Sequence, residues 1–553
     1  MYRLKYSFKQ IFDNLFFNIL FVALNAFVIY NMIIIYRGYS DVSDELASRS
    51  VSGAFLIDVS AKCFFYVIAY LLWSTYLSYK HRNSNFDELA FGNYRFGNYY
   101  YLIAVNLVNL TLSLLYCIII AIMSCSLDNM DMIFASYIIK RVLISFFLPA
   151  NLMILVGFVI GRIRNNLLPI LLIIMVAFVI SPTFLTILQT VSSYNARIIA
   201  CNFDVIQNNY YNASGFATDL VFGYMWAKII GMICVFSIPV CHVFIYKYKR
   251  FVASVLFVIF AVCEIYYYLP DSRVFDLIFA FKEDAYYSDV EVIEENVDFC
   301  ITDYCMDIEF GKTLKVSCDM KVSEKAKNEY TFTLYHTLKV KEVLVDGKNA
   351  DFSQNADWFT VYTDDNSSNI KVKYEGIIDY YVANGKYIYL PEDFPYYPLA
   401  GVKNIGKDGF LGSAMNDFKS HYTIKLYNYD DIISNLTGIG AGKYEGNSKG
   451  IMLLRGPVYE KVKNGITFIC PKYPYASRYC TDENLEMLAD MLYELEDTYD
   501  YSFSDKKILA IGYVYLGYLG TGNHFGDEYV DLVSTECRTV KRTFEEKFLY
   551  VED

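Results

Sequence analysis

The sequence predicts a polytopic α-helical membrane domain of about seven transmembrane helices, followed by an extracytoplasmic β-sandwich and a small α/β segment. Three observations lead to this fold class. First, 55% of the 553 residues are hydrophobic and only 20% are charged. Second, most apolar residues lie in long runs before residue 270. Third, the later chain alternates apolar and polar residues, which is typical of half-buried strands.

Seven apolar segments approach or exceed the roughly 20 residues that a membrane-spanning helix needs. They are Leu15–Ile35, Ala54–Tyr79, Tyr101–Ser124, Val142–Ile160, Leu167–Val191, Leu220–Tyr246 and Phe251–Leu269. The first is too long for a signal-peptide core, and no small-residue cleavage site follows it. We therefore expect it to be retained as a helix.

Lys and Arg residues near the ends of these segments predict the orientation. With a cytoplasmic N-terminus, the inner segments hold eleven positive residues and the outer connections hold five. The Lys140 and Arg141 pair is the weak point, because it falls on the outer side. This orientation places residues 270–553 outside the cytoplasm. The expected location is the plasma membrane of a bacterial cell.

Two cytoplasmic features are candidates for function. Residues 1–14 place Leu4, Phe8 and Ile11 near helical spacing with basic residues between them, which favours a helix lying in the membrane interface. A basic lead-in that only sets topology is the alternative. The first inner loop contains a short amphipathic segment that suits docking on a cytoplasmic partner. The alternative is that this segment is an ordinary solvated loop. Its key residues are Phe86, Asp87, Glu88, Leu89 and Phe91.

Four charged residues fall within the predicted spans. Asp58 and Lys62 are four residues apart, so they share a helix face and can pair. Lys228 and Glu264 are single charges in the sixth and seventh spans. Intramembrane charges usually face the interior of a helix bundle. Structural pairing is favoured over a proton relay.

This layout resembles the permease of type-2 ABC exporters over about residues 1–250. In that class the loop helix after the second span fits a cleft on an ATP-hydrolysing subunit, and residues 86–91 are its counterpart here. The resemblance also implies that the segment 192–219 corresponds to external half-helices. The sequence has no GxxxxGK[ST] phosphate loop, so ATP and Mg are expected on a separate ABC ATPase subunit. Six spans are half of the usual pore, which implies a second permease copy or a paralogue.

The outer half begins with a series of short strands. Leu314, Val316, Cys318 and Met320 alternate with polar residues, and Asp346-Gly347 supplies a turn. Further strands are expected at Tyr330–Tyr335, Val340–Val345, Phe359–Tyr362, Ile370–Tyr374, Tyr387–Leu390, Tyr422–Tyr427 and Ile451–Leu454. An antiparallel sandwich is the expected arrangement. A helix capped by Thr481 or Asp482 then places Leu485, Leu488, Leu492 and Leu495 on one face, and Lys507–Tyr513 is a strand candidate.

The order of these strands, with Tyr389-Leu390-Pro391 and Phe394-Pro395-Tyr396-Tyr397-Pro398 after them, resembles the N-terminal sandwich of zinc aminopeptidases of the aminopeptidase N family. The tail from about Gly465 resembles the opening of that family's catalytic domain, with residues 520–528 at its substrate-binding segment. The family's zinc site needs HExxH on a helix, and none of the five His forms it. They are His81, His242, His336, His421 and His524. The chain stops before the zinc helix would occur, so we expect no enzyme activity, no metal site and no cofactor on this chain.

Six cysteines lie in the outer half, where disulfides are permitted. Cys470 and Cys480 are placed to close a loop, and Cys300 is placed to pair with Cys305 or Cys318. Connectivity does not follow from spacing. Free buried thiols are the alternative.

The domains expected are an interfacial helix at 1–14, a six-helix permease-like domain at 15–250, a seventh transmembrane helix at 251–269, a β-sandwich at 270–460 and a small α/β segment at 461–553. The expected function is the transmembrane subunit of an ABC exporter of peptide-like or hydrophobic substrates, embedded in a lipid membrane. The alternatives are a membrane-anchored non-catalytic subunit of a metallopeptidase-like complex and an extracytoplasmic ligand sensor. Net charge is −12 and no basic stripe is present, so nucleic acid is not an expected partner.

Overall fold

The computed structural model of the chain describes residues 5–13, 15–41, 55–83, 94–127, 132–187, 218–267, 286–287, 297–471, 480–509 and 524–545, with short internal gaps. The chain divides into two compact units. One comprises Met1–Asn212 with Thr218–Ser272, and the other comprises Ala213–Ala217 with Arg273–Asp553.

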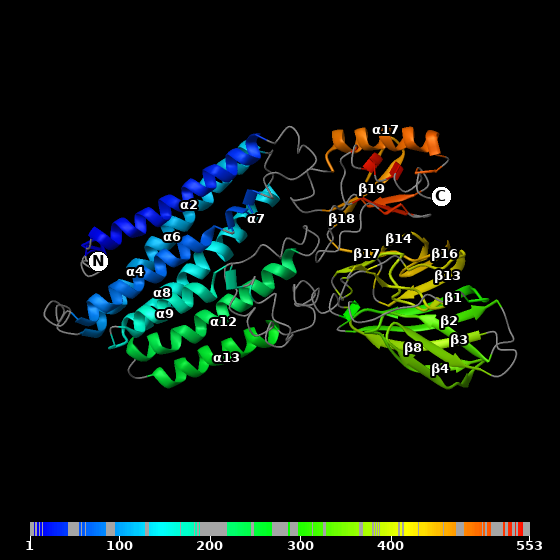
Figure 1. Cartoon of the computed structure of the whole chain (residues 1–553), viewed down its shortest axis with the longest axis horizontal. Coiled ribbons are helices and arrows are strands. Elements are labelled where there is room, and N and C mark those ends of the chain that lie inside the picture. Colours follow the sequence, from blue (N-terminus) through cyan, green and yellow to red (C-terminus); the bar gives the residue numbers. More distant parts are fainter. Residues whose placement is uncertain are drawn as a thin grey trace. The chain divides into compact units, whose positions relative to one another are not determined.

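The first unit is helical, and each of the seven predicted apolar segments contains a helix (Figure 1). The helices are α2 (Leu15–Asp41), α4 (Cys63–Asn83), α6 (Tyr94–Leu127), α7 (Met132–Val142), α8 (Leu148–Gly161), α9 (Leu168–Val179), α12 (Thr218–Phe244) and α13 (Lys249–Tyr267). Among the described residues, three stretches are long and apolar enough to cross a membrane: Leu15–Ser40, Tyr100–Leu127 and Ala135–Gly161. Two shorter apolar helical stretches, Leu168–Val179 and Trp226–Cys241, accompany them.

Three of the predicted spans differ from the observed helices. The second was expected from Ala54, but α4 begins at Cys63, after a separate helical segment at 55–60. The fourth is part of a longer helix in which the π-helix η1 (Leu143–Phe147) joins α7 to α8. The fifth was expected to reach Val191, whereas α9 ends at Val179, shortly before Pro182 in the sequence, because a proline disfavours helix in the residue before it.

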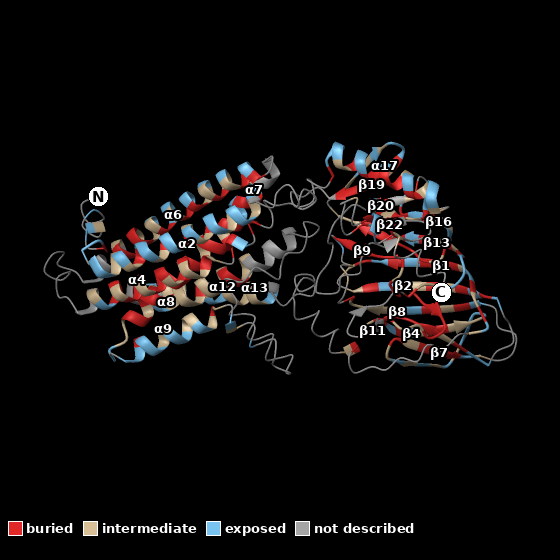
Figure 2. Ribbon diagram, turned by 45° about the horizontal axis from the view of Figure 1, so that its top comes forward, coloured by how far each residue is buried: buried red, intermediate tan, exposed pale blue. Residues whose placement is uncertain are grey.

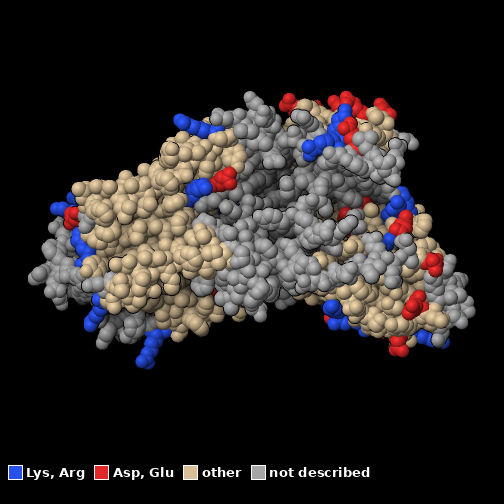
Figure 3. Space-filling view, viewed as in Figure 1, with Lys and Arg blue, Asp and Glu red and all other residues tan. Residues whose placement is uncertain are grey.

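Helix α6 exposes apolar residues and buries several polar ones. Leu114, Ile118 and Ile122, spaced by four residues, are 57%, 57% and 64% exposed. Asn109 and Ser113 on the same helix are buried. This is the reverse of a helix on a water-soluble protein, and it suits a lipid-facing surface. Figure 2 shows exposed faces along several helices, and Figure 3 shows that little charge interrupts the visible sides of the described helices.

Helices α4 and α8 pack closely through small residues. A Cβ on Gly157 would lie 2.8 Å from the carbonyl oxygen of Leu71, and a Cβ on Gly161 would collide with the carbonyl oxygen of Thr75. The hydroxyls of Ser74 and Ser78 donate hydrogen bonds across the contact to the carbonyls of Ile154 and Phe158, at 2.7 and 2.8 Å. The two glycines therefore let the backbones of α4 and α8 come close enough for the serine hydroxyls of α4 to reach the carbonyls of α8.

The second unit begins with a β-sandwich. An eight-stranded sheet has the order β15-β16-β13-β1-β2-β8-β4-β5, and a four-stranded sheet has the order β10-β3-β7-β6. The strands of the large sheet are β1 (Ile301–Glu309), β2 (Leu314–Val322), β4 (Lys339–Val345), β5 (Lys348–Asn349), β8 (Asn369–Gly376), β13 (Ser420–Leu426), β15 (Thr437–Gly440) and β16 (Lys443–Ser448). Those of the smaller sheet are β3 (Glu329–Thr333), β6 (Phe352–Asn355), β7 (Trp358–Tyr362) and β10 (Leu399–Ala400). A third sheet has three strands in the order β14 (Ile433–Ser434), β17 (Leu453–Arg455) and β9 (Ile388–Leu390).

Strands occur at each predicted position of the sandwich, and the structure adds several that were not predicted, among them β1, β15 and β16 of the large sheet. The alternation on β2 buries Leu314, Val316, Cys318 and Met320 as expected. Strand β1 was not predicted, although it lies between β2 and β13 in the large sheet. It pairs with β13 in parallel, so the sheet is mixed and not purely antiparallel. The predicted turn is present, because Asp346 and Gly347 both have positive φ angles, 47° and 81°.

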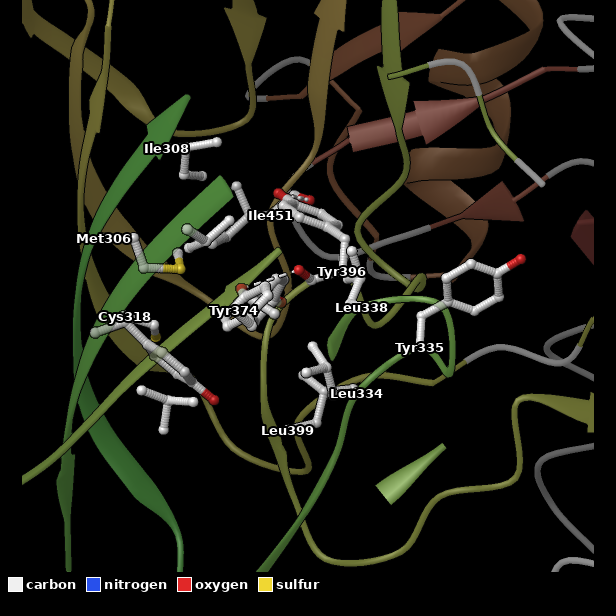
Figure 4. Packing of buried hydrophobic residues seen from close by; sticks show 14 of the residues in the cluster. Met306, Ile308, Cys318, Leu334, Tyr335, Leu338, Tyr374, Tyr396, Leu399 and Ile451 are labelled. Atoms are coloured by element: carbon white, nitrogen blue, oxygen red, sulfur yellow. Dashed lines mark hydrogen bonds between the residues drawn. The ribbon is translucent and has the colours of Figure 1, made fainter. Parts of the chain in front are cut away.

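A tyrosine-rich core joins the sheets (Figure 4). The hydroxyl of Tyr374 donates to the carbonyl oxygen of Tyr396 at 3.0 Å, and the hydroxyl of Tyr396 donates to that of Ile451 at 3.0 Å. Burial raises the pKa of both tyrosines well above the ordinary value. These phenols therefore stay neutral and act as hydrogen-bond donors inside the sandwich.

A mixed five-stranded sheet and one helix complete the described chain. The sheet order is β18 (Val458–Lys463), β19 (Ile466–Pro471), β20 (Lys507–Leu509), β22 (Tyr529–Asp531) and β21 (His524–Phe525). Helix α17 (Asp482–Tyr499) buries the four predicted leucines, each at most 2% exposed. Thr481 caps it, because its hydroxyl accepts a hydrogen bond from the Asn484 N–H at 3.2 Å. The expected strand from Lys507 is described as far as Leu509.

Candidate functional site

The helical unit encloses a network of uncharged polar side chains. The hydroxyl of Tyr66 on α4 donates to the Oδ1 atom of Asn109 on α6 at 2.6 Å, and it lies 3.1 Å from the hydroxyl of Ser113. These three residues are at most 4% exposed. The spacing of Asn109 and Ser113 by four residues puts both on one face of α6. Two helices are thus joined by polar contacts within an apolar bundle.

The same asparagine connects the network to the π-helix. The Nδ2 atom of Asn109 donates to the backbone carbonyl of Phe147 at 3.1 Å, and Nδ2 of Asn151 donates to that carbonyl at 2.8 Å. A π-helix shifts the backbone bonding pattern, and side chains commonly satisfy the carbonyls at such sites. Asn109 therefore uses its acceptor towards α4 and its donor towards η1.

A second branch reaches α2. The hydroxyl of Tyr116 on α6 donates to Oδ1 of Asn25 at 3.0 Å, and Nδ2 of Asn25 donates to its own helix at the carbonyl of Phe21, at 2.8 Å. The ring of Tyr116 contacts the rings of Tyr66 and Phe146, with centroids 5.2 Å apart in each case. The network therefore involves α2, α4, α6 and η1. It is neutral, aromatic and hydrogen-bonded, and it links these elements inside the bundle.

Replacing Asn109 with leucine is expected to lower the stability of the helical unit by about 1–2 kcal/mol, because each buried interhelical hydrogen bond in a membrane contributes about 0.6 kcal/mol and up to about 1.7. Leucine has a similar volume, so packing is kept and only the polar contacts are lost. Thr111→Ala is the matched control, since this exposed hydroxyl bonds only the Leu107 carbonyl of its own helix, at 2.8 Å. Thermal unfolding in detergent measures both variants, and equal melting temperatures would refute the role of the network.

The structure places the four predicted charges in two settings. Asp58 is exposed, and its carboxylate accepts a hydrogen bond from the Tyr39 hydroxyl at 2.6 Å, so its partner differs from the expected Lys62. Lys228 is 1% exposed on α12, and its charge interacts with the carboxylate of Glu264 on α13. A Cβ on Gly231, one turn beyond Lys228, would lie 3.7 Å from Oε1 of that glutamate. The sequence named these two charges separately, and the α12–α13 contact brings them together.

The predicted ATPase-coupling residues Phe86, Asp87, Glu88, Leu89 and Phe91 lie outside the described residues. The ends of the helices that flank them are described. The ring of Phe17, near the start of α2, stacks on Tyr76, near the end of α4, with centroids 3.8 Å apart. Tyr101, near the start of α6, donates from its hydroxyl to the carbonyl of Ser74 at 3.2 Å. The two ends that this loop joins are therefore on the same side of the bundle as the start of α2 (Figure 1).

Two further predictions concern the interfacial helix at 1–14 and the external half-helices at 192–219, which the structure describes only in part. In the expected interfacial helix, Lys5, Phe8, Lys9 and Ile11 are helical, the two lysines are exposed and Ile11 is buried. The expected external half-helices at 192–219 fall almost wholly outside the described residues.

Arg141, half of the pair that opposed the predicted orientation, is 3% exposed. Its Nε atom donates to the hydroxyl of Ser60 at 3.3 Å. This guanidinium is therefore part of the interior of the helical unit and does not belong to a solvated loop.

The second unit holds a buried histidine–carboxylate pair. Nδ1 of His336 lies 3.1 Å from Oδ1 of Asp357, and that oxygen also accepts the backbone N–H of His336 at 2.8 Å. The ring of Tyr286, from the segment before β1, stacks on the imidazole with centroids 3.9 Å apart. His421 is instead exposed beside Glu445, with Nε2 and Oε1 3.2 Å apart. Among the residues that the structure describes, no group of three or more His, Cys, Asp or Glu side chains is placed to hold a metal ion.

No protein-family model and no curated protein matches the chain. Among solved structures, native leukotriene A4 hydrolase from Saccharomyces cerevisiae is similar at a TM-score of 0.31 and 12% identity, covering 44% of this chain and 42% of that chain. An M1 zinc metallopeptidase from Deinococcus radiodurans has a TM-score of 0.31 and 11% identity, covering 44% and 62%. An aminopeptidase N family protein from Idiomarina loihiensis has a TM-score of 0.30 and 10% identity, covering 41% and 42%. The chain spans less than two thirds of the length of each of these proteins.

Proposed function

We propose that this chain is the transmembrane subunit of an ABC exporter. Seven helices cross the membrane from a cytoplasmic N-terminus, and Arg273–Asp553 folds beyond the bilayer. The observation that carries this proposal is an apolar outer surface combined with a buried polar network in the helical unit. Leu114, Ile118 and Ile122 face outwards on α6, whereas Asn109 and Ser113 are buried against neighbouring helices. Exposed apolar faces with buried polar side chains between the helices are expected of a membrane transport protein.

The placement of Arg141 supports the proposed orientation. Topology follows the positive residues in short loops close to span ends. Because Arg141 is buried and hydrogen-bonded to Ser60, it is not a solvated loop charge. Without Arg141, four positive residues remain in the outer connections, against eleven in the inner segments.

Energy comes from a separate ABC ATPase that carries ATP and Mg. It docks on the loop between α4 and α6, whose flanking helix ends lie beside the cytoplasmic start of α2. A second permease copy or a paralogue completes the pore. The aromatic and uncharged interior around Tyr66, Tyr116 and Phe146 suits a hydrophobic or peptide-like substrate better than an ionic one.

Glu88→Arg is expected to abolish co-purification of the ATPase and the ATPase activity of the complex, while the protein stays in the membrane. The substitution reverses a charge at the centre of the proposed docking segment. The measurement is a pull-down followed by an ATPase assay. The matched control is Arg250→Glu, a charge reversal at an exposed position near the start of α13. Retained partner and unchanged activity in Glu88→Arg would remove the coupling assignment.

A further inference from the structure

Two cysteines of the C-terminal α/β part lie side by side. Cys470 is on β19, and Cys480 lies two residues before α17 begins. Their thiols are in hydrogen-bond contact. Cys470 is 0% exposed and Cys480 is 2% exposed, and both belong to one buried apolar cluster.

The backbone around both thiols is held in place from several directions. Cys470 pairs in register with Tyr459 across the β18–β19 ladder. The Nζ atom of Lys461 donates to the carbonyl of Cys480 at 3.0 Å and lies 2.6 Å from Oδ1 of Asp482. Thr481 caps the helix that follows. A strand ladder, a helix cap and an ion pair therefore fix the backbone at both cysteines, which are free thiols in the structure.

We propose that Cys470 and Cys480 form a disulfide in the mature protein, tying the end of β19 to the start of α17. This inference rests on the proposed location of the C-terminal unit outside the cytoplasm, where disulfides persist. The bond closes a short loop, so it restricts the unfolded chain and adds to the stability of the α/β part.

The chemistry is thiol–disulfide exchange with a donor that carries its own disulfide, such as a dithiol oxidoreductase or cystine. One cysteine thiolate attacks a donor sulfur, a mixed disulfide forms, and the other donor sulfur leaves as a thiolate. The second cysteine thiolate then attacks the protein sulfur of the mixed disulfide, and the remaining donor sulfur leaves as a thiolate. Two electrons and two protons pass in total, so an oxidoreductase leaves as its dithiol and cystine leaves as two molecules of cysteine.

Exchange takes place while the chain folds. In the folded reduced protein, the hydrogen-bond contact with Cys470 and burial raise the pKa of the Cys480 thiol far above its ordinary value. A thiol that does not ionise is a poor nucleophile. The bond therefore forms before the two cysteines are enclosed.

The other outer cysteines provide internal controls. Cys305 pairs in register with Asp319, and Cys318 pairs with Met306, so the two cysteines lie on opposite faces of the β1–β2 ladder. Cys305 is exposed and Cys318 is buried. Cys305 and Cys318 therefore do not face each other across this ladder, and both serve as unpaired references for the labelling.

The test uses the full chain, expressed in its membrane and denatured in guanidinium chloride at neutral pH with N-ethylmaleimide and no reductant, because N-ethylmaleimide labels the thiolate. Peptide mass spectrometry then reports each cysteine. We expect one linked peptide containing Cys470 and Cys480, unlabelled before reduction and doubly labelled after it, with Cys305 and Cys318 labelled throughout. In Cys470→Ser, Cys480 should become fully labelled. Reductant should lower the melting temperature of the wild type and of Cys305→Ser, but not that of the double variant Cys470→Ser/Cys480→Ser.

Protease added to intact cells runs in parallel and separates the two proposals. If external protease cuts the C-terminal unit and Cys470 and Cys480 are nevertheless labelled before reduction, the disulfide alone is overturned. The same labelling in a unit that protease leaves intact would overturn the proposed topology, and the disulfide with it. A link from either cysteine to Cys537, the third cysteine beside this cluster, would also overturn the assignment.

Discussion

Gly161→Leu is expected to prevent the helical unit from folding into a stable bundle. Any side chain at this position collides with the backbone of α4, at the carbonyl oxygen of Thr75, and a Cβ would lie 2.7 Å from that of Ser78. Backbone atoms cannot move aside as a flexible side chain can, so α4 and α8 must separate. Separation breaks the hydrogen bonds from Ser74 and Ser78 to α8. Overpacking alone costs roughly 1–3 kcal/mol, and the lost contact adds to it.

Thermal size-exclusion chromatography in detergent measures this effect. We expect little or no monodisperse Gly161→Leu protein above the lowest temperatures, and a smaller loss for Gly161→Ala. Gly38→Leu is the matched control, because no heavy atom lies within 4 Å of a Cβ built at that glycine. If Gly161→Leu melts at the same temperature as Gly38→Leu, the α4–α8 contact does not hold the bundle together.

Asp357→Ala is the second substitution with a large expected effect, about 1–3 kcal/mol, because it leaves a buried hydrogen-bond donor without its acceptor. The carboxylate accepts the backbone N–H of His336 at 2.8 Å and lies 3.1 Å from its ring, and it is 0% exposed. Alanine leaves that N–H without its acceptor inside the sandwich. Stacking of Tyr286 on the imidazole should weaken as well.

Two variants separate the hydrogen bond from the charge. Asp357→Asn keeps a carbonyl acceptor for the N–H of His336, so an intermediate loss is expected. Asp319→Ala removes an exposed carboxylate whose nearest cation, Lys371, lies 3.9 Å away, and such a surface pair contributes about 0–1 kcal/mol. Thermal unfolding and limited proteolysis of the full chain measure all three variants. Equal stability of Asp357→Ala and Asp319→Ala would show that the buried pair is dispensable.

Much of the architecture could be predicted because it depends on local patterns. Helices occur in all seven apolar segments, since length and hydrophobicity are properties of a continuous stretch. Helix α17 follows from four leucines at helical spacing, and the turn at Asp346-Gly347 follows from the tolerance of those residues for positive φ. Strand β1 was missed although Tyr304, Met306 and Ile308 alternate with polar residues and are buried.

The polar network was missed for a different reason. Asn25, Tyr66 and Asn109 each occur singly in apolar runs, and a single asparagine or tyrosine carries no charge to attract notice. The signal was present in the spacing of Asn109 and Ser113, which places two polar groups on one face of α6. The network partners of α6 are distant in sequence. Tyr66 on α4 is 43 residues from Asn109, Phe147 of η1 is 38 residues from Asn109, and Asn25 on α2 is 91 residues from Tyr116.

Sequence alone therefore determined the helical segments and many of the strands, though not all of their ends, since hydrophobic period and turn chemistry act over a few residues. Folding in three dimensions determined which polar groups meet. Asp58 accepts a hydrogen bond from Tyr39, 19 residues away, Tyr66 bonds Asn109, and Cys470 and Cys480 share one buried cluster. Such contacts depend on how helices and strands pack, and packing depends on the shapes of many side chains at once, which no short stretch of the chain contains.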